Sequence, residues 1–166
     1  MRLAKSVTLL FTIAFVNFNL AGAKENDSFS GKWVLDKQSP RPGDAPNELE
    51  TKIKQDNAGF SMESTFLEPK NGVLPLLYLG IMAEKVQLNT DGQERETQIG
   101  PFTAKFKSSM DGNKLLTDWT AQIKGDLVQG HWVHTLSEDG KHMTLEIQET
   151  STQSQHAEAT LYFVRK

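Results

Sequence analysis

The chain has 166 residues, a formal net charge of -3 at pH 7 and no cysteine. The length suits one domain with a substantial core. The lack of cysteine excludes disulfides, zinc–cysteine sites, a thiol nucleophile and a lipid-modified cysteine. The acidic balance argues against nucleic acid as a partner, because nucleic-acid binding needs a basic face.

The first 23 residues have the pattern of a secretory signal peptide. Arg2 and Lys5 precede an apolar run over residues 7–16, and Ala23 ends a stretch of small residues at the cleavage positions. We therefore expect cleavage after Ala23, a mature domain over residues 24–166 with a charge of about -5, and export to a periplasmic or extracellular location. An N-terminal membrane anchor is the alternative, although the apolar run is shorter than a bilayer span.

The first expected strand runs from Phe29 to Leu35. Phe29, Trp33 and Leu35 share one face at a period of two, and Gly31 lies between them where a side chain would crowd a neighbouring backbone. The stretch that follows, residues 36–46, is dense in proline and charge, so we expect a loop there.

Alternation next predicts a hairpin between residues 48 and 66, with a turn at residues 56–59. Its inner positions are expected to be Leu49, Thr51, Ile53, Phe60, Met62, Ser64 and Phe66.

The stretch over residues 67–83 does not alternate, and its apolar run Val73–Met82 predicts one short helix or loop insertion around residues 68–83. Pro75 suits a first helical position. Because long connections in compact β domains are usually functional, we expect this segment to act as a lid or a docking patch. The residues expected to carry that role are Leu76, Leu77 and Ile81. A helix that merely covers apolar surface is the alternative.

The remainder of the chain alternates again, with Asp-Gly turns at residues 91–92, 111–112 and 139–140. The positions expected on one face of each strand are Val86, Leu88, Phe102, Ala104, Phe106, Ser108, Met110, Leu115, Thr117, Trp119, Ala121, Ile123, Met143, Leu145, Ile147, Ala157, Ala159, Leu161 and Phe163. Over residues 127–136, periodicity does not decide whether Trp132 or Val133 faces inward.

These patterns predict an all-β fold of eight to ten antiparallel strands in an up-and-down β-barrel. Closure is the simplest arrangement because it removes the edges that so many strands would expose. A two-sheet sandwich is the alternative.

The motif Gly31-Lys32-Trp33, with Arg165 on the last strand, resembles the signature of the calycin superfamily of lipocalins and fatty-acid-binding proteins. The resemblance implies a lipocalin-like barrel whose base is plugged by Trp33, with the Arg165 guanidinium stacked on the indole. Thr117-Asp118-Trp119 is similar to the Thr-Asp-Tyr element of true lipocalins. Lipocalins carry a helix before the final strand and fatty-acid-binding proteins a helical pair after the first, and neither pattern occurs here. Exported bacterial lipocalin-like domains are the most similar group.

No catalytic motif is present, so an enzyme is the less favoured class, and no cofactor or metal is expected. His131 and His134 are three residues apart on a strand and face opposite ways, so they cannot share one ion. The carboxylates fall mostly on expected outer faces, where they are solvated. These carboxylates are Glu63, Asp118, Glu146 and Glu149. Nitrobindin-like haem barrels use a histidine near the last strand, as His156 is here, but the further glycines of those barrels are missing.

The favoured hypothesis is an exported barrel that binds a small hydrophobic or amphipathic ligand. The candidate lining residues are Phe60, Met62, Phe66, Phe102, Phe106 and Trp119. A filled core would use the same residues, so a packed structural or interaction barrel is the alternative, and a haem-binding or isomerase-like barrel comes third. No nucleic-acid partner and no membrane span after signal removal are expected. The sequence does not specify an oligomeric state.

Overall fold

The computed structural model describes residues 28–40, 48–67, 85–99, 101–123, 125–153 and 156–166. These residues form ten strands and no helix. The strands are β1 Gly31–Leu35, β2 Glu48–Gln55, β3 Gly59–Leu67, β4 Val86–Asn89, β5 Asp91–Ile99, β6 Phe102–Asp111, β7 Lys114–Ile123, β8 Asp126–Leu136, β9 His142–Ser151 and β10 His156–Arg165. The expected signal peptide and the insertion around residues 68–83 lie outside the described residues.

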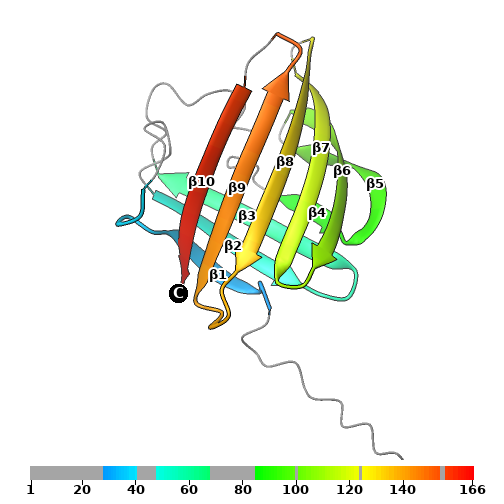
Figure 1. Ribbon diagram of the computed structural model, residues 1–166. Helices are drawn as coiled ribbons and strands as arrows, with labels where there is room; N and C mark the ends of the chain where they lie inside the picture. Colours follow the sequence, from blue (N-terminus) through cyan, green and yellow to red (C-terminus); the bar gives the residue numbers. More distant parts are fainter. Residues whose placement is uncertain (1–27, 41–47, 68–84, 100, 124, 154–155) are drawn as a thin grey trace, which may run out of the picture.

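One continuous antiparallel sheet joins all ten strands in the order β4-β3-β2-β1-β10-β9-β8-β7-β6-β5 (Figure 1). Strands that follow each other along the chain are neighbours, and β1 pairs with β10 so that Trp33 lies opposite Arg165. The pairing of the first and last strands curls the meander into a nearly closed barrel. The prediction of an up-and-down barrel is therefore confirmed, and the sheet is not divided into a sandwich.

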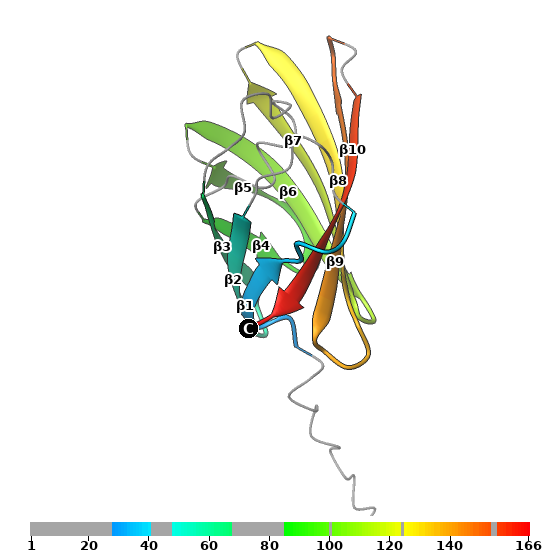
Figure 2. The same ribbon diagram turned by 90° about the vertical axis from the view of Figure 1, so that its left-hand side faces the viewer.

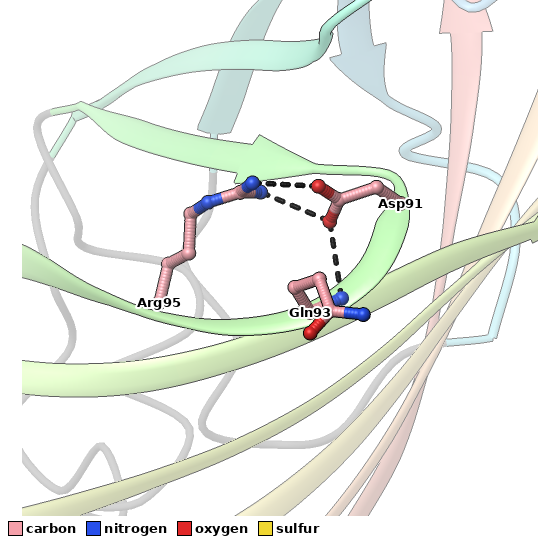
Figure 3. A network of polar contacts seen from close by, with 3 residues as sticks. All are labelled: Asp91, Gln93 and Arg95. Atoms are coloured by element: carbon pink, nitrogen blue, oxygen red, sulfur yellow. Dashed lines mark hydrogen bonds and ion pairs between the residues drawn. The ribbon is translucent and has the colours of Figure 1, made fainter.

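At the start of β5, one of the two end strands of this sheet, three residues of the same strand form a polar network (Figure 3). The Asp91 carboxylate accepts bonds from Arg95 Nη1 and Nη2 at 2.9 and 2.6 Å and from the backbone N–H of Gln93 at 3.0 Å. These bonds, above all those from Arg95, hold the pKa of Asp91 below its usual range. The network braces a β-bulge between Asp91 and Glu94, and bulges of this kind discourage an edge strand from pairing with another chain.

The alternation in sequence becomes an inner and an outer face because successive side chains of a strand point to opposite sides. In β6, Ala104, Phe106 and Ser108 are buried while Lys105 and Lys107 are exposed. The same pattern in β8 resolves the question that periodicity left open, since its inner residues are Trp132, His134 and Leu136. Figure 2 shows strands β2–β4 as one side of the barrel and β8–β10 as the other.

Candidate functional site

Trp33 and Arg165 lie opposite each other where the first and last strands pair, next to the C-terminus. Trp33 is fully buried, and its Nε1–H donates to the carbonyl oxygen of Phe29 at 2.8 Å. The Arg165 guanidinium carbon lies 4.6 Å from the centroid of the Trp33 ring. Its Nη1 and Nη2 donate to the carbonyl oxygens of Ser30 and Ser28 at 2.9 and 2.6 Å. A ligand therefore needs an opening elsewhere in the barrel.

The structural requirement for glycine at position 31 differs from the one expected from sequence. A Cβ at this position would lie 3.5 Å from Arg165 Nη1, which is ordinary van der Waals contact, so no backbone is crowded. Its φ of 147° is instead a conformation that residues with a side chain rarely adopt. The requirement is conformational, and the expectation of crowding was wrong.

A groove crosses the barrel wall where β1 and β2 separate. The β1–β2 ladder ends at the pair Val34–Glu50, whereas β1 stays paired with β10 as far as Leu35. The groove has a volume of about 530 Å³. It is lined by Val34, Leu35, Asp36, Lys37, Glu48, Leu49, Glu50, Thr65, Val164 and Lys166. The groove therefore borders two buried residues of the inner face, Leu35 and Leu49.

The rim of this wall groove carries both signs of charge around an apolar floor. Lys37 Nζ lies 2.5 Å from Glu48 Oε1, an ion pair between the two chain segments that diverge there. Glu50 on the outer face is paired with Lys32 at 2.7 Å. An apolar floor with a mixed polar rim suits an uncharged or amphipathic molecule better than a strongly charged one.

Inside the barrel, a cavity of about 30 Å³ lies between the two walls. Its lining is Leu49, Thr51, Met62, Ser64, Val86, Trp132, His134, Met143, Leu145 and Phe163. This is room for one or two water molecules. Leu49 lines both the cavity and the wall groove, so both hollows border that side chain.

The cavity is apolar apart from one hydroxyl pair and one histidine. The hydroxyls of Thr51 and Ser64 lie 3.0 Å apart and bond to each other. Nδ1 of His134 is buried without a hydrogen-bond partner among the described residues. Burial lowers the pKa of His134 to about 4, so the ring is neutral near pH 7 and offers a hydrogen bond without a charge.

The lining residues predicted from sequence do not lie together. Met62 lines the cavity, and Phe60 packs edge-on against Phe29 with ring centroids 5.5 Å apart. Phe106 and Trp119 form a buried cluster with Trp132, with centroids 5.4 to 6.4 Å apart. Phe102 is partly buried against the core, and the Phe66 side chain lies outside the described residues. Phe60, Phe106 and Trp119 are therefore packed in the core rather than lining the cavity.

Glu149 was expected on the outer face and instead lies inside the barrel, only 1% exposed. Its Oε1 accepts a bond from Trp132 Nε1 at 3.2 Å, while its Oε2 has no partner among the described residues. Burial raises the pKa of Glu149 to about 8, against the lesser effect of the Trp132 bond. The carboxyl is therefore mostly protonated at neutral pH.

Sequence reasoning missed Glu149 and His134 as interior polar groups because it assigned charged side chains to the solvent. The alternation itself held the signal. Glu149 follows Ile147 at a spacing of two on the face that also includes Leu145, and His134 lies between Trp132 and Leu136 in the same way.

The other histidines lie on the outside of the wall. His131 Nδ1 lies 2.7 Å from Asp118 Oδ1, and His156 Nε2 lies 3.0 Å from Glu158 Oε1. Among the residues that the structure describes, no three His, Asp or Glu side chains are grouped to hold a metal ion. His156 is exposed, so the side chain considered for haem does not point into the barrel.

The candidate lid, with Leu76, Leu77 and Ile81, lies outside the described residues, and its role stays a prediction. In the parts of the chain that are described, no helix has the length and apolar character to cross a membrane.

No family model and no curated protein matches the sequence, but solved structures share the fold. The zebrafish ileal bile acid-binding protein complexed with cholic acid is 17% identical, with a TM-score of 0.51 over 83% of this chain and 98% of that one. A secretory abundant heat soluble protein from Ramazzottius varieornatus is 13% identical, with a TM-score of 0.50 over 83% of this chain and 95% of that one. Secretory abundant heat soluble protein 4 of the same organism is 14% identical, with a TM-score of 0.50 over 82% and 94%. The likeness is one of fold, and the fold is that of the calycin-type barrels.

Proposed function

We propose that this protein is an exported calycin-type barrel that binds one small hydrophobic or amphipathic molecule through the wall groove and the cavity behind it. The observation that carries the proposal is the pair of hollows that share Leu49 as a lining residue, one at the wall and one inside the barrel. The groove volume of about 530 Å³ falls within the usual range for ligand pockets. A barrel of the same fold, the zebrafish protein, is complexed with cholic acid, which is itself amphipathic.

The small internal cavity favours a ligand that lies partly in the groove and extends inward. Met62 and Met143 line the cavity, and their unbranched side chains adapt to a guest more readily than branched ones. The same small volume is the observation behind the second candidate, a packed barrel without a ligand. Binding of an uncharged apolar probe separates the two.

The binding test compares the groove with a matched position on the far wall. Val34 and Val133 are both half-buried outer-face valines, and each lies opposite a glutamate, Glu50 and Glu146 respectively. Val34→Asp places a carboxylate in the groove, so we expect it to weaken binding of Nile red about tenfold. Val133→Asp should leave the affinity within about twofold of the wild type, as measured by fluorescence titration.

Two outcomes would contradict the proposal. If the wild type binds no Nile red, the packed barrel is the correct description. If Val34→Asp and Val133→Asp weaken binding equally, the probe binds somewhere other than the wall groove.

Export is proposed from the sequence alone. The charged start, the apolar run and the small residues up to Ala23 support cleavage after that residue. N-terminal sequencing of the exported protein is expected to begin at Lys24. Recovery of the chain from membranes with Met1 intact would rule this out.

A further inference from the structure

Three polar atoms near the aromatic cluster are buried without hydrogen-bond partners among the described residues. They are Trp119 Nε1, Glu149 Oε2 and Ser151 Oγ, the last of which also faces the Asp126 carboxylate and, after the hydrogen bond from Thr152, helps to lower its pKa. Buried polar atoms without partners are rare in native proteins and unfavourable. Three of them, on β7 and β9 on either side of β8, mark a place where a polar group of another molecule would be stabilised.

Gly130 lets the Trp119 indole lie over β8, beside the position of Glu149. Trp119, Gly130 and Glu149 lie in one row across β7, β8 and β9. Trp119 Nε1 occupies the space of the missing Gly130 side chain, since a Cβ there would lie 2.1 Å from it. Glu149 stands directly opposite on β9, where paired Cβ positions are about 5 Å apart. Ser151 is the next inner residue of β9, about 7 Å along the strand.

The donors and acceptors of this cluster select the chemistry of its partner. Trp119 N–H can only donate, so the partner must carry a lone pair, which excludes an ammonium group. A carboxylate would bring a second acidic group beside Glu149, and the causes of the raised pKa of Glu149 include no cation. No Lys or Arg is among the buried residues of the described interior. An uncharged hydroxyl can accept from Trp119 and donate to Glu149 or Ser151.

We propose that Trp119, Glu149 and Ser151 form a subsite for an uncharged hydroxyl group, so that the ligand is a hydroxyl-bearing amphiphile such as a long-chain alcohol. This inference rests on the interior binding proposed above. Leu145 lines the cavity, and four residues of β9 separate it from Glu149, a span of about 13 Å. An alkyl chain reaching toward the cavity would place its hydroxyl at the subsite. Trp132 connects the two places, because it lines the cavity and donates to Glu149.

The first arm of the test uses the wild-type protein and three ligands with the same tail. 1-Decanol, decanoate and decyltrimethylammonium compete with Nile red at pH 7, and we expect decanol to bind at least about tenfold more tightly than either charged ligand. Equal or tighter binding of a charged ligand would overturn the hydroxyl subsite but leave interior binding intact. Binding of Nile red that decanol does not displace would likewise overturn the hydroxyl subsite and leave interior binding intact. Failure of every ligand and of Nile red to bind would overturn the proposed function itself.

The second arm removes single hydrogen-bonding groups. Trp119→Phe keeps an aromatic ring and loses the N–H, so decanol affinity should fall about 3- to 10-fold. Ser151→Ala is a smaller change that should also weaken decanol binding. This variant tests the subsite if Trp119→Phe fails to fold. Trp33→Phe is the matched control, the same change at the closed end, and should bind decanol as the wild type does. Wild-type decanol affinity in both Trp119→Phe and Ser151→Ala would overturn the subsite.

Discussion

Replacing Glu149 with Gln is expected to change the pH dependence of stability more than any other single substitution described here. The pKa of Glu149 is raised from 4.5 to about 8 by burial, so between these values the folded protein holds a proton that the unfolded chain has lost. Stability of the wild type therefore falls as pH rises through this window, by about 1.4 kcal/mol per pH unit. The glutamine side chain of the variant does not titrate. The stability of the variant relative to the wild type should grow by on the order of 5 kcal/mol between pH 4.5 and pH 8.

His134 acts in the opposite direction over a lower range of pH. Its pKa is lowered from 6.5 to about 4 by burial, so the unfolded chain takes up a proton first and stability is lost as pH falls from 6.5 to 4. In the wild type, the effects of Glu149 and His134 on the free energy of unfolding cancel between about pH 4.5 and 6.5. Above about pH 6.5 only the effect of Glu149 remains, so the free energy of unfolding declines. In Glu149→Gln, we expect stability to rise up to about pH 6.5 and then to stay level.

Urea denaturation at half-unit steps of pH measures both curves. Glu146→Gln is the matched control, the same chemical change on the exposed outer face of β9, so the difference between the two variants isolates burial. Parallel curves for the wild type and Glu149→Gln between pH 4.5 and 8 would show that the Glu149 carboxyl is not enclosed.

Trp33→Ala is expected to lower the free energy of unfolding by about 3–5 kcal/mol, as large-to-small changes of a buried aromatic residue do. The indole is fully buried, and its removal leaves the Phe29 carbonyl oxygen without its 2.8 Å bond and Arg165 without the ring beneath it. Denaturant midpoints measure the loss. A change of less than about 1 kcal/mol would mean that the closed end is held by other contacts.

Two further substitutions separate the parts of this effect. Trp33→Phe keeps a ring and loses the N–H, so it should cost about 1 kcal/mol, as the loss of one buried hydrogen bond does. Arg165→Ala should cost about 0.5–2 kcal/mol if stacking on the indole contributes as cation–π pairs do. An Arg165→Ala cost equal to that of Trp33→Ala would shift the main role from the ring to the carbonyl contacts of Ser28 and Ser30.

The strands were predictable wherever a local pattern decided the outcome. In β6 and β7 every second residue is apolar or small, and Asp111-Gly112 marks the turn between them. Side-chain period and turn chemistry depend on a few neighbouring residues, so no tertiary contact is needed to recognise them. The candidate site was harder to predict. Of the five expected lining residues whose side chains the structure describes, only Met62 lines the cavity, because inward orientation does not reveal which inward side chains pack against each other.

By itself the sequence determined the all-β class, the sequential strand order and the Gly31–Trp33 strand, since each is written in patterns a few residues long. Only the tertiary structure decided where the hollows and the buried polar atoms lie. The wall groove forms because β1 stays paired with β10 beyond the residue at which its pairing with β2 ends. Glu149 has an aromatic neighbour because Gly130 on β8 has no side chain and leaves room for the Trp119 ring, which comes from β7. Both depend on the register of strands paired across the barrel, and register is a relation between distant parts of the chain.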